Sequence, residues 1–174
     1  VNSSWVLQGT EGQCIGEFAA DIATLRAADI AVVFSAGNSG PADYTSMEPA
    51  NDPGSLSVGA IDSLLNVILS SSRGPSACDA GVYPRIAAPG KDVITAGLTT
   101  NGANPTDYAF GTGTSFAAPH VAGALAVLKG AFLDTPLADI EAAVEQGAFD
   151  IGLAGPDYDS GAGLVDAVEA FNLL

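Results

Sequence analysis

The stretch YAFGTGTSFAAPHVAGALAV, residues 108–127, joins a glycine-broken approach to an apolar helix. Gly111 and Gly113 interrupt the approach, and Pro119 falls in the first turn of the helix. A proline is tolerated there because its missing N–H would have no intrahelical partner. Ser115 stands at the helix start, where backbone N–H groups and the helix dipole favour a developing negative charge. This position suits a nucleophile, and it also suits an ordinary N-cap serine.

A serine nucleophile needs a base within hydrogen-bond reach, and the sequence offers few candidates. The single histidine, His120, lies further along the same helix, about 140° around its axis and about 7.5 Å along it. It therefore points away from Ser115 and is expected to be an ordinary helix residue. Lys129 lies roughly 20 Å down the helix, and Lys91 follows a Pro-Gly turn. Neither lysine makes a convincing partner for Ser115.

A phosphate-binding loop is another function that a glycine-rich turn before a helix suggests. The segment GTGTS, residues 111–115, lacks the lysine of a P-loop. Phe116 occupies the third glycine place of a dinucleotide-binding fingerprint. The sequence therefore argues against phosphate recognition.

The composition is that of an acidic globular chain. Its 174 residues correspond to about one domain. Hydrophobic residues make up 48% and charged residues 14%, which argues against disorder. A net charge of −15 argues against a nucleic-acid partner. The longest strongly apolar stretch, the helix after Ser115, is interrupted by Pro119, His120 and Gly123 and is too short to cross a bilayer, so no membrane partner is expected.

Short apolar runs alternate with segments of helical periodicity along the chain. Strands are predicted at 1–6, 30–35, 56–61, 67–71 and 85–88, and a hairpin from 93–98 and 108–110. Helices are predicted at 17–28, after Ser115, at 137–146 and at 164–171. The alternation predicts an α/β fold with a mainly parallel, buried sheet and flanking helices.

Six motifs, in order along the chain, resemble those of the subtilisin-like serine peptidases, the subtilase family. The segment GTSFAAPHVAG, residues 113–123, resembles the nucleophile signature, and AGNSGP, residues 36–41, the oxyanion-hole segment. The others are PANDP with VGA (49–53 and 58–60), SSRGP (71–75), IAAPG (86–90) and GAGLVDA (161–167). The resemblance covers essentially the whole chain and is closest in style to the secreted, bacillopeptidase-like branch. It implies a serine endopeptidase with a partial subtilisin-like fold.

By this resemblance Ser115 carries over as the nucleophile and Asn38 as the side-chain oxyanion donor. Asn38 follows a predicted buried strand and could aim its amide at the charge that grows on the scissile carbonyl oxygen. Taken alone, Asn38 also fits an ordinary turn residue. The related sedolisin-like peptidases have an aspartate at this place, so Asn38 argues against that family.

The resemblance also implies a peptide-binding strand and a facing pocket wall. The first is Ser4-Trp5-Val6, to which an extended peptide or protein substrate would add as a strand, and the second is the segment Ser35, Ala36 and Gly37. The family usually has glycine in place of Val6, so this side chain is expected to crowd the substrate backbone. The predicted pocket segments contain no clear basic or acidic residue that would select a substrate side chain, so the sequence does not predict substrate preference.

No cofactor and no catalytic metal are expected for such a peptidase. In some relatives a structural cation, such as calcium, is held by backbone carbonyls. In this chain the corresponding segment lies around Ala50, Asp52 and Ser55.

The family order is aspartate, histidine, then serine, and residues 1–174 offer neither partner. We therefore expect the chain to be the C-terminal half of a single catalytic domain. Ser115 should then be inert in the chain alone. A sheet edge and apolar surface should need the N-terminal half or a second chain to cover them. The alternative function is a non-catalytic module, derived from a subtilase, that binds peptides or partners.

The two cysteines bear on where the protein works. Cys14 and Cys78 could form one disulfide in a secreted protein, or remain two thiols, because the sequence gives no distance between them. The resemblance favours a secreted, extracellular protein.

Overall fold

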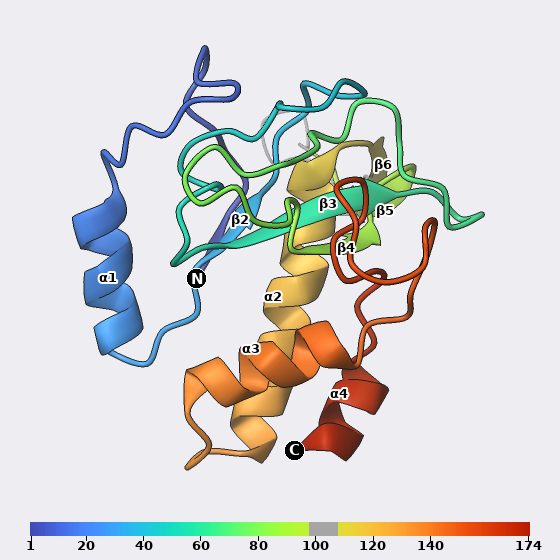
Figure 1. Ribbon diagram of the computed structural model, residues 1–174. Coiled ribbons are helices and arrows are strands. Elements are labelled where there is room, and N and C mark those ends of the chain that lie inside the picture. The colour runs from blue at the N-terminus through green and yellow to red at the C-terminus, as the bar shows by residue number, and fades with distance from the viewer. Residues whose placement is uncertain (98–107) are drawn as a thin grey trace.

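A four-stranded parallel sheet forms the centre of the molecule, in a computed structural model that describes residues 1–97 and 108–174 (Figure 1). Its strands lie side by side in chain order: β1 (Asn2–Ser3), β2 (Val33–Ser35), β3 (Leu56–Ile61) and β4 (Ile86–Pro89). The strands β2 and β3 are buried along their whole length, as expected for a parallel sheet covered on both faces. The predicted α/β class and mainly parallel sheet are confirmed.

Helices cover both faces of the sheet. The long helix α2 (Thr114–Ala131) packs with Val33 and Val58 from one face, together with α3 (Leu137–Gln146) and α4 (Ala167–Leu173) (Figure 1). The short helix α1 (Ala19–Ala27) packs Ile22 against Val32 and Phe34. Because successive strand residues face opposite sides, α1 and α2 lie on opposite faces.

An antiparallel hairpin leads into α2. It pairs β5 (Val93–Ala96) with β6 (Tyr108–Gly111). The hairpin is predicted correctly from the sequence, although Leu98, which the prediction includes, lies outside the described residues. Gly113 then precedes the helix, which begins at Thr114.

Outside the hairpin, three of the predicted strands differ from the structure by more than one residue. The strand predicted at 30–35 begins only at Val33. The strand predicted at 1–6 is shorter, because beyond Ser3 the chain leaves the ladder with β2. Residues 67–71 form no strand: Val67 makes a single bridge to Ile61, and the N–H of Ser71 donates back to the carbonyl of Ile68.

The last helix, predicted at 164–171, starts at Ala167 because the Asp166 side chain accepts hydrogen bonds from the first-turn N–H groups.

The strand β1 lies at one edge of the sheet. Near it, Val1 is 59% exposed and Trp5 45% exposed. Among the described residues, no helix is both long and apolar enough to cross a membrane.

Candidate active site

Ser115 lies in the first turn of α2, and the turn before it depends on glycine. Gly113 has φ 142°, a conformation that favours glycine. Its N–H donates to the carbonyl of Gly90 at 2.7 Å. Gly113 is the N-cap of the helix, so the N-cap interpretation of Ser115 is wrong. Ser115 is instead the second residue of the helix, half-buried at the positive end of the helix dipole.

The side chain of Asn38 meets the same turn from the end of β2. Its Oδ1 accepts a hydrogen bond from the backbone N–H of Thr114 at 3.0 Å. A Cβ on Gly113 would lie 3.2 Å from this oxygen, so the glycine also makes room for the amide. Because the oxygen accepts from a backbone donor, the NH2 group is the part of the amide that can donate elsewhere. Asn38 is exposed, and its NH2 group can therefore donate a hydrogen bond to a bound substrate.

Thr114 fastens the Asn38 loop to the start of α2. Its buried hydroxyl accepts from the N–H of Gly37 at 3.2 Å and lies 3.2 Å from both the Gly37 carbonyl and the Asn38 Oδ1. Its role was missed in the sequence, although its place beside Ser115 was a signal that could have found it.

Ser4 meets Ser115 through two hydrogen bonds. The Ser115 hydroxyl donates to the carbonyl of Ser4 at 3.3 Å, and the Ser4 hydroxyl donates to the carbonyl of Ser115 at 2.9 Å. The first predicted binding residue is thus placed directly at the candidate nucleophile. The hydroxyl proton of Ser115 points at a backbone oxygen, which cannot act as a general base.

His120 is oriented as the helical spacing predicts. Its exposed ring hydrogen-bonds through Nδ1 to the carbonyl of Phe116 at 2.8 Å. A carbonyl only accepts, so Nδ1 carries the proton. Within the described residues nothing supplies a histidine base to Ser115.

The other predicted binding residues form two groups. Trp5 stacks edge-on against Phe18 and Phe34, with ring centroids 5.3 and 5.5 Å away, and Val6 is half-buried. The segment Ser35, Ala36 and Gly37 is buried. The carbonyl of Ala36 accepts from the hydroxyl of Tyr83.

The backbone of the pocket-wall segment is already held by the fold. The carbonyl of Gly37 accepts from the N–H of Ser72 at 3.0 Å, in addition to its contact with Thr114. Burial also raises the pKa of Tyr83, so its phenol stays protonated and keeps donating to Ala36. The structure therefore brings Ser115, Asn38, Ser4 and Gly37 together, while Trp5 packs to one side.

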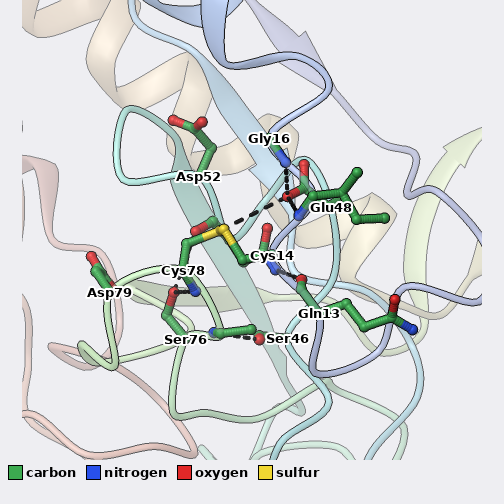
Figure 2. The surroundings of a disulfide bond; sticks show 12 residues. Gln13, Cys14, Gly16, Ser46, Glu48, Asp52, Ser76, Cys78 and Asp79 are labelled. Atoms are coloured by element: carbon green, nitrogen blue, oxygen red, sulfur yellow. Dashed lines mark hydrogen bonds between the residues drawn. A yellow bond between two sulfur atoms is a disulfide. The ribbon is translucent and has the colours of Figure 1, made fainter.

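Cys14 and Cys78 form a disulfide (Figure 2), which resolves the choice that the sequence leaves open. Their sulfurs and a Glu48 carboxyl oxygen lie within 4.8 Å of one another. Bonded sulfurs are not thiolates, so this cluster is not a metal site in the oxidised protein.

The segment around Ala50, Asp52 and Ser55 lines a cavity of about 630 Å³. The carbonyl of Asp52 already accepts from the N–H of Ser55 at 2.9 Å. Arg85, paired with Glu145 at 2.6 Å, lines the same cavity. A structural cation there stays a prediction.

Comparisons with known proteins agree on one family. A model of the subtilase family matches residues 1–163. The chain is 38% identical to fervidolysin from Fervidobacterium pennivorans over 78% of its own length and 20% of that protein. It is 32% identical to bacillopeptidase F from Bacillus subtilis over its whole length and 12% of that protein. Among solved structures, a mutant of the protease domain of PatA is 26% identical with TM-score 0.77, over 99% of this chain and 58% of that one.

The chain spans a fifth or less of the length of these two relatives and 58% of the solved protease domain. The likeness in structure places its α/β architecture among subtilisin-like protease domains. These relatives do not resolve the branch of the subtilase family to which the chain belongs, so the bacillopeptidase-like branch stays a prediction.

Proposed function

Because this chain belongs to the subtilase family of serine peptidases, we propose that it carries the nucleophile half of a secreted serine endopeptidase. The catalytic aspartate and histidine lie upstream of residue 1, and together with residues 1–174 they complete one catalytic domain. The contact that carries this proposal is the hydrogen bond from the Thr114 N–H to the Asn38 Oδ1, at 3.0 Å. It leaves the amide nitrogen of the exposed Asn38 as a donor at the turn that precedes Ser115.

The chemistry follows from this placement. The Ser115 oxygen attacks the scissile carbonyl while the upstream histidine takes its proton. Negative charge develops on the carbonyl oxygen, where the NH2 group of Asn38 and the N-terminal dipole of α2 stabilise it. Collapse of the tetrahedral intermediate leaves an acyl-enzyme on Ser115 and releases the amine product. Water then repeats the sequence and releases the acid.

Substrate binding uses the segment Ser4–Val6. An extended peptide or protein would add to this edge as a strand, with Ser35–Gly37 as the facing wall. The contact between Ser4 and Ser115 supports this assignment. The Cys14–Cys78 disulfide supports secretion, because such bonds persist in oxidising compartments.

A non-catalytic peptide-binding module is the second candidate. Val6 is half-buried where the family usually has glycine, and the Ser115 hydroxyl donates to the Ser4 carbonyl. Such a module would retain the binding edge without turnover. Retention of both Ser115 and Asn38 favours the peptidase, because binding needs neither.

A fluorophosphonate probe tests the proposal, since it reacts only with an activated serine. The full-length protein should be labelled at Ser115, and residues 1–174 alone should not, because the upstream base is absent. Ser115→Ala should abolish labelling, and His120→Ala should keep it. Asn38→Ala should lower turnover by roughly 10²–10³, the loss already known for the oxyanion asparagine of a subtilisin. A full-length protein that binds peptide but resists the probe would favour the second candidate.

A further inference from the structure

A loop follows directly on the peptide-binding segment and is held along its length by one neighbouring segment. The loop is residues 7–16, and the neighbour is residues 46–51. The N–H of Leu7 donates to the carbonyl of Glu48 at 2.8 Å, and the N–H of Gly12 to the carbonyl of Ser46 at 2.9 Å. The hydroxyl of Thr10 accepts from the N–H of Glu48 at 3.1 Å. Leu7 is the first residue after Val6, so these hydrogen bonds to residues 46–51 begin where the peptide-binding segment ends.

The carboxyl group of Glu48 holds the far end of the same loop. Its Oε1 accepts hydrogen bonds from the N–H groups of Ile15 and Gly16, both at 2.9 Å (Figure 2). Glu48 is fully buried, and its Oε2 has no hydrogen-bond partner among the described residues. A buried carboxyl group with one orphan oxygen is costly. The two hydrogen bonds to the loop offset part of this cost.

The disulfide closes the arrangement. Cys14 lies in the loop, one residue before the pair that Glu48 holds, and Cys78 lies 3.8 Å from the Glu48 Oε1 (Figure 2). The segment that contains Cys78 is fixed to residues 46–51 as well. The N–H of Ala77 donates to the hydroxyl of Ser46 at 3.0 Å, and the hydroxyl of Ser76 to the carbonyl of Asn51 at 3.3 Å. The disulfide therefore links residues 7–16 to the segment that contains Cys78, and both are hydrogen-bonded to residues 46–51.

We propose that Glu48 and the Cys14–Cys78 disulfide form a clamp that positions Ser4–Val6 for an extended peptide, and that reduction of the disulfide weakens peptide binding. This inference rests on the proposed function, in which Ser4–Val6 binds the substrate. Glu48 is a positioning residue, because it acts on the peptide only through the loop. Cys14 is exposed, which gives an external dithiol access to the bond.

The clamp should act on binding more than on chemistry. Asn38 and the turn before Ser115 are held by Thr114, Gly113 and Gly90, none of which belongs to the clamp. Ser4 is the member of the binding segment that contacts Ser115, and it lies three residues before Leu7, where the clamped loop begins. One exposed contact links the loop to the vicinity of Asn38, from the Ser39 hydroxyl to Glu11 at 3.2 Å. Loss of the clamp should therefore raise KM for an extended peptide and leave kcat nearly unchanged.

Dithiothreitol tests the clamp in the full-length protein. It donates two electrons and two protons to the Cys14–Cys78 bond, yields two thiols and becomes its own cyclic disulfide. We expect KM for an extended peptide to rise by about tenfold, with kcat and the rate of fluorophosphonate labelling within roughly twofold. The variant carrying Cys14→Ser and Cys78→Ser should show the raised KM without reductant and no further response to it.

Two substitutions of Glu48 separate positioning from folding. Glu48→Gln keeps a carbonyl oxygen for the N–H groups of Ile15 and Gly16 and should preserve KM. Glu48→Met keeps the length, removes the acceptor and should raise KM as reduction does. Thermal unfolding of each variant identifies any that fails to fold. If a Glu48 variant fails to fold, the effect of reduction on KM of the native protein tests the clamp instead, because it needs no substitution.

The failure of the clamp and that of the proposed function give different results. In Ser115→Ala, the dissociation constant of a fluorescent extended peptide can be measured without turnover. If the native protein resists the probe but peptide binding still weakens on reduction, the peptidase proposal fails and the clamp stands. If labelling occurs and neither KM nor the dissociation constant changes after thiol titration shows full reduction, the clamp is overturned.

Discussion

Thr114 is the residue through which the Asn38 loop and the nucleophile helix are joined. Its hydroxyl is buried and accepts from the N–H of Gly37, while its own N–H holds the Asn38 oxygen. Thr114→Val keeps the shape and the backbone donor but leaves the N–H of Gly37 without its acceptor. We expect a loss of about 1–3 kcal/mol in the free energy of unfolding. Denaturant titration measures it.

The same substitution should affect turnover. A loosened Gly37 displaces the neighbouring Asn38, and a loss of about 1.4 kcal/mol in transition-state stabilisation lowers kcat about tenfold. Thr114→Ser is the matched control, because it retains the hydroxyl and should retain kcat. Equal kcat for the valine and serine variants would contradict this role of Thr114.

At the scale of elements, Asp29 joins three helices. It follows α1, its carboxylate pairs with Lys129 of α2 at 2.6 Å, and it accepts from the N–H of Leu137 at the start of α3 at 3.0 Å. The hydrogen bond with Lys129, and then that with Leu137, lower the pKa of Asp29. The exposed carboxylate of Asp29 thus accepts a hydrogen bond at the start of α3 and also forms an ion pair with α2.

The lowered pKa sets the sign of a pH effect. The unfolded chain protonates this group first, so the contribution of Asp29 to stability is present at neutral pH and is lost as pH falls below about 4. Asp29→Asn should therefore lower Tm at pH 7, and the difference from the native protein should narrow in acid. Asp43→Asn, a charge removal in an exposed loop, is the control. An Asp29→Asn difference that stays constant with pH would contradict the assignment.

The elements themselves follow from the sequence to different degrees. Residues 56–61 and 137–146 are predicted with the bounds that the structure has, because a fully buried strand and an amphipathic helix carry their own periodicity. Residues 67–71 have the same apolar character and form no strand. Their hydrogen bonds go to a turn and to Ala60, which composition does not specify.

At the scale of the molecule, one face of α2 is small and exposed. Gly123 and Gly130 have no neighbouring atom within 4 Å of a built Cβ among the described residues, and Val127 is 69% exposed. If the proposed upstream half covers this face, Gly123→Leu should lower Tm of the full-length protein through overpacking. In residues 1–174 alone, the leucine would meet open space and should not destabilise the helix.

The comparison needs a control on the helix itself. Gly123→Ala replaces the glycine with a better helix former and a small side chain, and should stabilise residues 1–174 by about 0.5–1 kcal/mol. An unchanged Tm of the full-length protein with Gly123→Leu would show that no upstream element packs there.

The sequence by itself determined the α/β class and the family, and it identified Ser115 and Asn38 as candidate site residues. The motifs are contiguous, and helix geometry alone removes His120 as a base. Only the tertiary structure decided that Ser4, 111 residues from Ser115 in the sequence, exchanges hydrogen bonds with it. It also decided that Cys14 and Cys78, 64 residues apart, are bonded. Local periodicity describes neighbours within a few residues, whereas these contacts depend on how a whole sheet and its loops pack.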